Sequence, residues 1–87
     1  MAEVRQTEVF KAWFAGLRDQ QARARIRVRI DRLSLGNPGD IKRVGSGVSE
    51  MRINYGPGHR LYFVSRCKTV VVLLCGGDKR SQDRDIA

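Results

Sequence analysis

The sequence predicts an α+β fold in which two N-terminal helices pack on a curled antiparallel sheet of about four strands. Two observations carry this prediction. Apolar residues recur at helical spacing in the first part of the chain, and short apolar runs separated by tight turns fill the second part. The chain has 87 residues, which gives room for one hydrophobic core. We therefore expect a single domain over residues 1–87.

The first helix is expected to begin after Thr7, because threonine can accept a hydrogen bond from the first turn of a helix. Four apolar residues then fall at i, i+3, i+4 and i+7, on one helical face: Phe10, Trp13, Phe14 and Leu17. Three of them are aromatic, so we expect this face to pack the helix against the sheet. Residues 3–6 can form a short strand before it.

The segment ARARIRVRID, residues 22–31, fits two structures. Its alternation of arginine with apolar residues has the period of a half-buried strand. A helix would instead gather one apolar stripe, with Arg25, Arg29 and Arg32 beside it: Ala22, Ile26, Ile30 and Leu33. Asp19 stands where an N-cap belongs, Gly36 is a candidate C-cap, and strands of about 16 residues are unusual. These features favour a helix.

Runs with strand character follow the predicted turn at residues 37–40. They are residues 41–44, 48–54, 60–68 and 70–75. Residues 55–58, with the sequence YGPG, make a hairpin connection, and residues 67–69 make a second tight turn. Because consecutive strands joined by short turns pair antiparallel, the sequence predicts an antiparallel sheet.

Alternation along two of these strands sorts their side chains onto two faces. One face should pack under the helices: Met51, Ile53, Leu61 and Phe63. Arg52, Arg60 and Tyr62 then gather on the opposite face. This arrangement is either a cationic binding face or an ordinary solvated face with ion pairs, such as Glu50 with Arg52 or Arg60. The residues alone leave both alternatives open.

A Gly-Gly pair at residues 76–77 ends the last apolar run, and Lys79 and Arg80 follow it. Glycine allows a close approach of the backbone. We therefore expect the pair to let the chain pass near the cationic face while Lys79 and Arg80 turn towards it.

The net charge of +8 comes from 17 cations and 9 anions, and arginine outnumbers lysine 13 to 4. Guanidinium groups bind phosphates through two parallel hydrogen bonds, so a polyanionic partner such as RNA, DNA or an acidic protein segment is expected.

Two cysteines and one histidine are too few ligands for a zinc site, and no metal or cofactor is expected. Without a signal sequence or an apolar run long enough to span a membrane, a cytoplasmic protein is expected.

Two segments make a resemblance visible: GNPGDIKRVGSGVSEMRINYGPGHRLYF and VVLLCGGDKRSQDRDI. Their combination of EMRI, GPGHR and GGDK resembles the RelE/HigB superfamily of toxin–antitoxin toxins, and it is closest to the branch of addiction-module killer proteins. The segment FKAWFAGLRDQQARARIRVRIDRL also fits that branch. The resemblance therefore covers almost the whole chain.

The resemblance implies a microbial-RNase-like fold and cleavage of mRNA, typically on the translating ribosome. It also implies a metal-free reaction, in which the 2′-hydroxyl of the substrate attacks the adjacent phosphodiester, and neutralisation by a cognate antitoxin, usually a helix-turn-helix DNA-binding protein. Carried over position by position, it assigns the site cations to Arg52, Arg60, Lys79 and Arg80.

The acid–base group is open at this stage, because some relatives carry a catalytic C-terminal tyrosine that this chain lacks. His59 is a candidate since imidazole titrates near neutrality, although alternation turns it away from Arg60 unless the turn breaks the register. Tyr62 is a second candidate if the cations lower the pKa of its phenol. The residues expected to bind RNA are Lys42, Arg43, Tyr55, Arg25 and Arg29, with Tyr55 able to stack a base.

Two other functions compete with the ribonuclease. A ParE-like toxin would share the fold and inhibit DNA gyrase without cutting RNA. A catalytically inactive basic module would bind RNA and never cleave it. The arginine stripe of the second helix has its own alternatives, namely ribosomal RNA, an acidic antitoxin segment or solvent.

Overall fold

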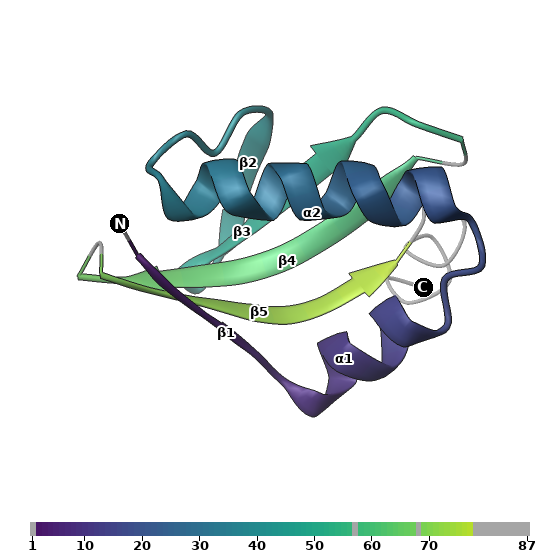
Figure 1. Ribbon diagram of the computed structural model, residues 1–87. Coiled ribbons are helices and arrows are strands. Elements are labelled where there is room, and N and C mark those ends of the chain that lie inside the picture. The colour runs from purple at the N-terminus through teal and green to yellow at the C-terminus, as the bar shows by residue number, and fades with distance from the viewer. Residues whose placement is uncertain (1, 57, 68, 78–87) are drawn as a thin grey trace.

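A computed structural model of the chain describes residues 2–56, 58–67 and 69–77 (Figure 1). Its seven elements run in the order β1 (Glu3–Gln6), α1 (Glu8–Ala15), α2 (Gln20–Ser34), β2 (Ile41–Gly45), β3 (Val48–Ile53), β4 (His59–Arg66) and β5 (Val70–Gly77). The predicted α+β class is confirmed.

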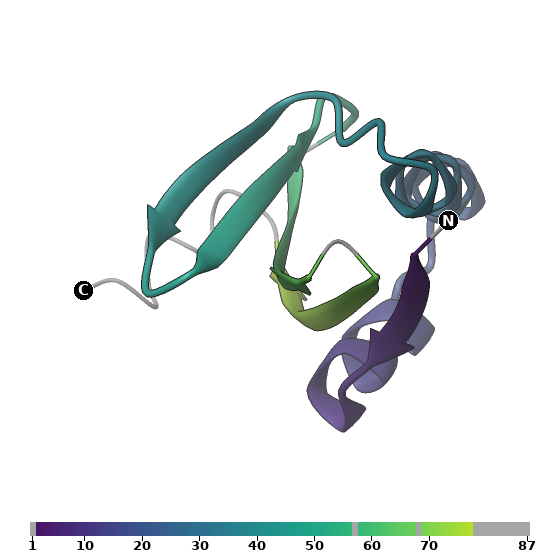
Figure 2. The ribbon, with the colours of Figure 1, turned by 90° about the vertical axis from the view of Figure 1, so that its left-hand side faces the viewer.

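The strands form one five-stranded sheet in the order β1-β5-β4-β3-β2. Strands β2 to β5 are antiparallel neighbours, as predicted, whereas β1 pairs with β5 in parallel. The prediction of about four antiparallel strands is therefore corrected to a mixed sheet of five. Figure 2, in which α2 is seen end-on, shows both helices on one side of the strongly curled sheet.

Both helices begin at the predicted caps. Thr7 Oγ1 accepts from the Phe10 amide at 3.1 Å, and Asp19 Oδ1 accepts from the Gln21 and Ala22 amides at 2.9 and 3.3 Å. Residues 22–31 are thus helical, and the strand alternative is wrong. Within the described residues, neither helix is long and apolar enough to cross a membrane.

The hydrophobic core lies between the helices and the sheet. The predicted faces of β3 and β4 are confirmed, because Met51, Ile53, Leu61 and Phe63 are at most 3% exposed. They pack with residues of α1, α2 and β5: Phe10, Ile26, Leu33, Val71 and Leu73. Full burial of such a side chain stabilises the fold by about 1.5–3 kcal/mol. Burial of this face therefore fixes the pairing register of β3 and β4, and that register also positions the side chains on the opposite face of the sheet.

A bulge in β5 changes which face its last residues occupy. Phe63 pairs with Leu73 and Tyr62 with Cys75, so the register skips Leu74. Gly76 consequently lies opposite Leu61 on the helix side, where a Cβ atom would stand 2.3 Å from a ring carbon of Trp13. The expected role of Gly76 is therefore corrected, since it makes room for the indole of Trp13 on the helix side, whereas Gly77 lies opposite Arg60 on the other face, as expected.

Replacing Gly76 by alanine should force the indole of Trp13 out of its site. We expect the free energy of unfolding to fall by about 1–3 kcal/mol, as is typical of an overpacked core, and thermal denaturation should show it. Gly16→Ala is the matched control, because a Cβ atom there meets only ordinary contacts at 3.5 and 3.6 Å. Equal stability of the Gly76→Ala variant and the wild type would contradict the contact between Trp13 and β5.

Candidate functional site

Cross-strand register gathers polar side chains on the sheet face opposite the helices. One row across β2, β3, β4 and β5 holds Lys42, Glu50, Tyr62 and Cys75. The next row holds Arg52, Arg60 and Gly77. We call the five residues Lys42, Glu50, Arg52, Arg60 and Tyr62 the cation face. Three members of the predicted catalytic set, together with Lys42, therefore lie on one surface.

Glu50 lies at the centre of this surface and is 2% exposed. Its Oε1 accepts from Arg60 Nη1 at 2.9 Å and from Arg52 Nε at 3.1 Å, and its Oε2 accepts from the Tyr62 hydroxyl at 3.2 Å. A carboxylate buried this deeply requires such partners, because an uncompensated buried charge is strongly unfavourable. Sequence reasoning placed Glu50 on this face but considered it only as an ion-pair partner.

The two arginines stand directly opposite each other on β3 and β4. Like charges in this position repel, and the shared Oε1 atom of Glu50 offsets that repulsion. The Arg52 side chain remains 41% exposed and that of Arg60 20%. Each guanidinium has five N–H donors, so the bonds to Glu50 leave donors on both for an anionic group at the surface.

Tyr62 is held in its protonated form. Burial, followed by the charge of Glu50 and the hydrogen bond to it, raises the pKa of the phenol to about 12, and the nearby Arg60 offsets this only in part. The condition set for Tyr62 as a base, a phenol pKa lowered by the cations, is not met, because burial and Glu50 raise the pKa by more than Arg60 lowers it. Near neutral pH, Tyr62 is a hydrogen-bond or proton donor and cannot act as a base.

The titration of Tyr62 can be measured directly, because the chain has two tyrosines and Tyr55→Phe leaves only one. In that variant we expect phenolate absorbance with a midpoint near pH 12. Since the folded-state pKa exceeds the ordinary value of 10.0, the unfolded chain releases the proton first. The free energy of unfolding should therefore fall as the pH rises from 10.0 to about 12. A midpoint at or below pH 10.0 would contradict the contact with Glu50.

His59 lies on the helix side of the sheet. It pairs with Ile53, so the alternation continues unbroken from the turn into β4. The residue is 7% exposed, its ring stands edge-on to Trp13 with 6.2 Å between centroids, and its Nδ1 atom has no hydrogen-bond partner among the described residues. The His59 ring thus packs on the helix side, while the residue also borders the hollow that contains Arg52 and Arg60.

The other predicted RNA-binding residues fall in different places. Arg43 pairs with Ser49 and borders an apolar hollow on the helix side, beside Phe63. Tyr55 lies under Arg25, whose guanidinium carbon is 4.7 Å from the ring centroid. Lys79 and Arg80 lie outside the described residues.

Arg29 binds the protein's own backbone. Its guanidinium donates to the carbonyl oxygens of Arg52 at 2.7 Å, Pro38 at 3.0 Å and Asp40 at 3.3 Å. These bonds tie α2 to β3 and to the turn before β2. Gly39 allows the approach, because a Cβ atom there would stand 2.9 Å from the guanidinium. Arg29 therefore holds β3 in place, and because it also lines the hollow between α2 and β3, its expected contact with RNA stays a prediction.

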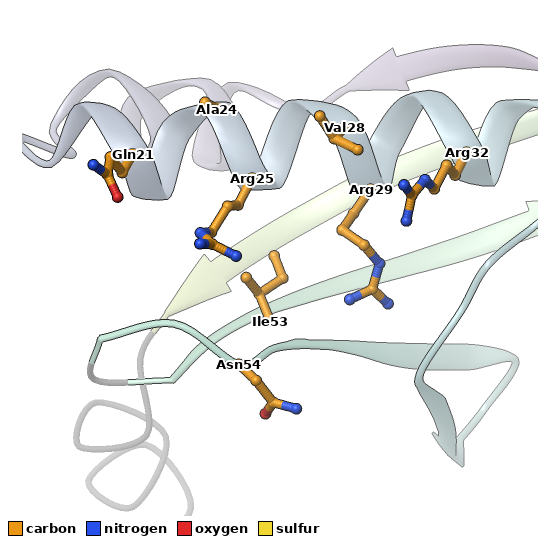
Figure 3. Close-up of a pocket in the computed structure, with 8 residues that line it drawn as sticks. All are labelled: Gln21, Ala24, Arg25, Val28, Arg29, Arg32, Ile53 and Asn54. Carbon is orange, nitrogen blue, oxygen red and sulfur yellow. The ribbon is translucent and has the colours of Figure 1, made fainter.

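Two hollows meet at the end of β3. One, of about 520 Å³, follows the turn between β3 and β4 and includes Arg52, Tyr55 and Arg60 in its wall. The other, of about 470 Å³, lies between α2 and β3 (Figure 3). Both include Ile53 and Asn54, so the two hollows adjoin at the end of β3, next to Arg52.

Comparison with known proteins places the chain in a family. No protein-family model matches it. An uncharacterised protein of Haemophilus influenzae is 45% identical over 84 residues, which cover 97% of this chain and 85% of that protein. The chain belongs to the family of this protein. Among solved structures, the solution structure of HP0894, a conserved hypothetical protein of Helicobacter pylori, matches with a TM-score of 0.55 and 17% identity. The match covers 92% of this chain and 97% of HP0894, and it extends the likeness to the fold.

Proposed function

We propose that the protein is the toxin of a type II toxin–antitoxin pair of the RelE/HigB superfamily, and that it cleaves mRNA, on the ribosome, without a metal ion. One observation carries the proposal: the buried Glu50 holds Arg52 and Arg60 together at a surface, beside a protonated Tyr62. Further support comes from the motifs EMRI, GPGHR and GGDK. A cognate antitoxin in the cytoplasm is part of the proposal.

The reaction requires charge stabilisation at phosphorus. The 2′-oxygen attacks the adjacent phosphorus, the bond to the 5′-oxygen breaks, and a 2′,3′-cyclic phosphate forms. Negative charge builds on the non-bridging oxygens as the new bond forms. Arg60, held by Glu50 Oε1, supplies N–H donors for those oxygens without reorganising at the moment of reaction, and Arg52 supplies further donors once it has turned towards the bound phosphate. Lys42, which pairs with Glu50 across β2 and β3, adds positive charge beside them.

Glu50 is the base in this proposal. In the absence of substrate both arginines occupy its Oε1 atom. When the more exposed Arg52 turns towards a phosphate, Oε1 can accept the proton of the 2′-hydroxyl. Tyr62, with its pKa raised to about 12, carries a proton that it can give to the departing 5′-oxygen. The resemblance adds Lys79 and Arg80 to the same site.

The test is to induce the protein in a bacterial host and map new RNA 5′ ends across the transcriptome within minutes. New ends in phase with codons are the expected result, and a frameshifted copy of the gene is the control. Growth arrest without new ends would overturn the proposal. DNA gyrase inhibition would then be assayed, because the ParE-like alternative predicts that outcome.

A further inference from the structure

The hollow between α2 and β3, here called the α2 groove, has the features of a second binding surface. Arg25 and Arg32 stand on its helical wall, and Ile53 and Asn54 form the opposite one (Figure 3). Ala24 and Val28, also on α2, add an apolar strip at the edge of the helical wall, and Val28 is 46% exposed. Cations beside an apolar strip suit a ligand with both charged and flat apolar parts.

Nucleotides are ligands of this kind, because they combine a charged phosphate with a flat base. The Arg25 guanidinium already covers the ring of Tyr55, which extends a flat surface from the turn onto the helix. Bases stack on aromatic and guanidinium planes. Asn54 is exposed just after β3 and points its amide away from α2 (Figure 3), where it offers both donors and an acceptor to a base that leaves the groove at this end.

The groove is also joined to the proposed cleavage site. Arg52, Ile53 and Asn54 are consecutive, and the last two belong to both hollows. Arg29 fixes this junction by donating to the Arg52 carbonyl at 2.7 Å. A strand of RNA with its scissile phosphate at Arg52 and Arg60 can therefore continue past the end of β3 into the groove.

We propose that the α2 groove binds the single-stranded RNA next to the cleaved nucleotide, with Arg25 and Arg32 contacting its phosphates. This inference rests on the proposed ribonuclease function and names the subsite that makes the enzyme prefer a longer substrate. The position of the groove at the end of β3, directly after Arg52, favours RNA over an acidic peptide, which would need no link to Arg52.

The experiment measures binding of 2′-O-methyl RNA, which cannot be cleaved by 2′-oxygen attack, to the full chain by fluorescence anisotropy. The probes are a dinucleotide and an octanucleotide. We expect Arg25→Ala and Arg32→Ala each to weaken octanucleotide binding about tenfold and to leave dinucleotide binding unchanged. The slope of log affinity against log salt should fall by about 0.7 for each lost contact.

Arg27→Ala is the matched control, because it removes the same charge from α2 while its guanidinium lies over Phe14, 5.5 Å from the ring centroid, in another hollow. If Arg27→Ala weakened octanucleotide binding as much as the groove variants do, the effect would come from overall charge, and the inference would be overturned.

Wild-type protein that binds both probes equally would also overturn the inference while leaving the proposed function standing. Binding of neither probe, even with ribosomes present, would count against the proposed function itself. Tighter binding of an oligoglutamate of equal charge, weakened by the same groove variants, would assign the groove to an acidic protein segment instead.

Discussion

Replacing Arg60 by alanine is expected to slow RNA cleavage by about 10²–10³-fold, which is the usual cost of losing one preorganised donor to a transition-state oxyanion. Arg60 is the better fixed of the two arginines, since its side chain is 20% exposed and its Nη1 atom donates to Glu50 at 2.9 Å. The measurement is the initial rate of cleavage of a defined mRNA on programmed ribosomes, with thermal denaturation as a check on folding.

Two variants separate a specific role from loss of charge. Arg66→Ala removes the same charge from the exposed far end of β4 and should leave the rate unchanged. Arg60→Lys keeps the charge but loses the planar fork, so we expect an intermediate rate. If Arg60→Ala and Arg66→Ala were equally impaired, the arginine pair would have no special function. Full activity of Arg60→Ala would place the reaction elsewhere on the protein.

Glu50→Gln should have a comparable effect, because removal of a general base typically costs 10²–10⁴-fold in rate. The amide keeps the shape of the side chain and can still accept hydrogen bonds from Arg52 and Arg60. It cannot take a proton from the 2′-hydroxyl. We expect the wild-type rate to fall in acid as the carboxylate is protonated, and the residual rate of the variant to lack this acid limb.

The pH profile distinguishes a base from a positioning group. A Glu50→Gln variant that is slow but keeps the acid limb would assign Glu50 to positioning the arginines alone. Glu50→Ala tests the structural part separately, since it leaves both guanidinium groups and the Tyr62 hydroxyl without their shared acceptor. We expect it to lower the free energy of unfolding by about 1–3 kcal/mol.

Local patterns in the sequence were sufficient to predict most of the fold. The caps at Thr7 and Asp19 and the alternation in β3 and β4 depend on neighbouring residues, and the structure confirms them. The parallel pairing of β1 with β5 joins residues far apart in the chain, and no local pattern indicates it. The bulge at Leu74 is similar, because no local pattern indicates the register shift that brings Gly76 under Trp13.

The same distinction applies to the site. The alternation of side chains along β3 and β4 was enough to place Arg52, Arg60 and Tyr62 on one face of the sheet. The raised pKa of Tyr62 depends on burial and on Glu50 lying against its hydroxyl, which strand alternation does not specify. The hydrogen bonds from Arg29 to three carbonyl oxygens could not be predicted either, because they form only when the turn at residues 37–40 folds back against α2.

The most direct test of the proposed reaction is to identify the ends of RNA cut by the purified protein on programmed ribosomes. Attack by the 2′-oxygen predicts a 2′,3′-cyclic phosphate or its opened product at the new 3′ end. It also predicts no cut when the nucleotide before the scissile phosphate carries a 2′-O-methyl group. Cleavage of the methylated RNA would contradict attack by the 2′-oxygen and, with it, the roles given to Glu50, Arg52 and Arg60.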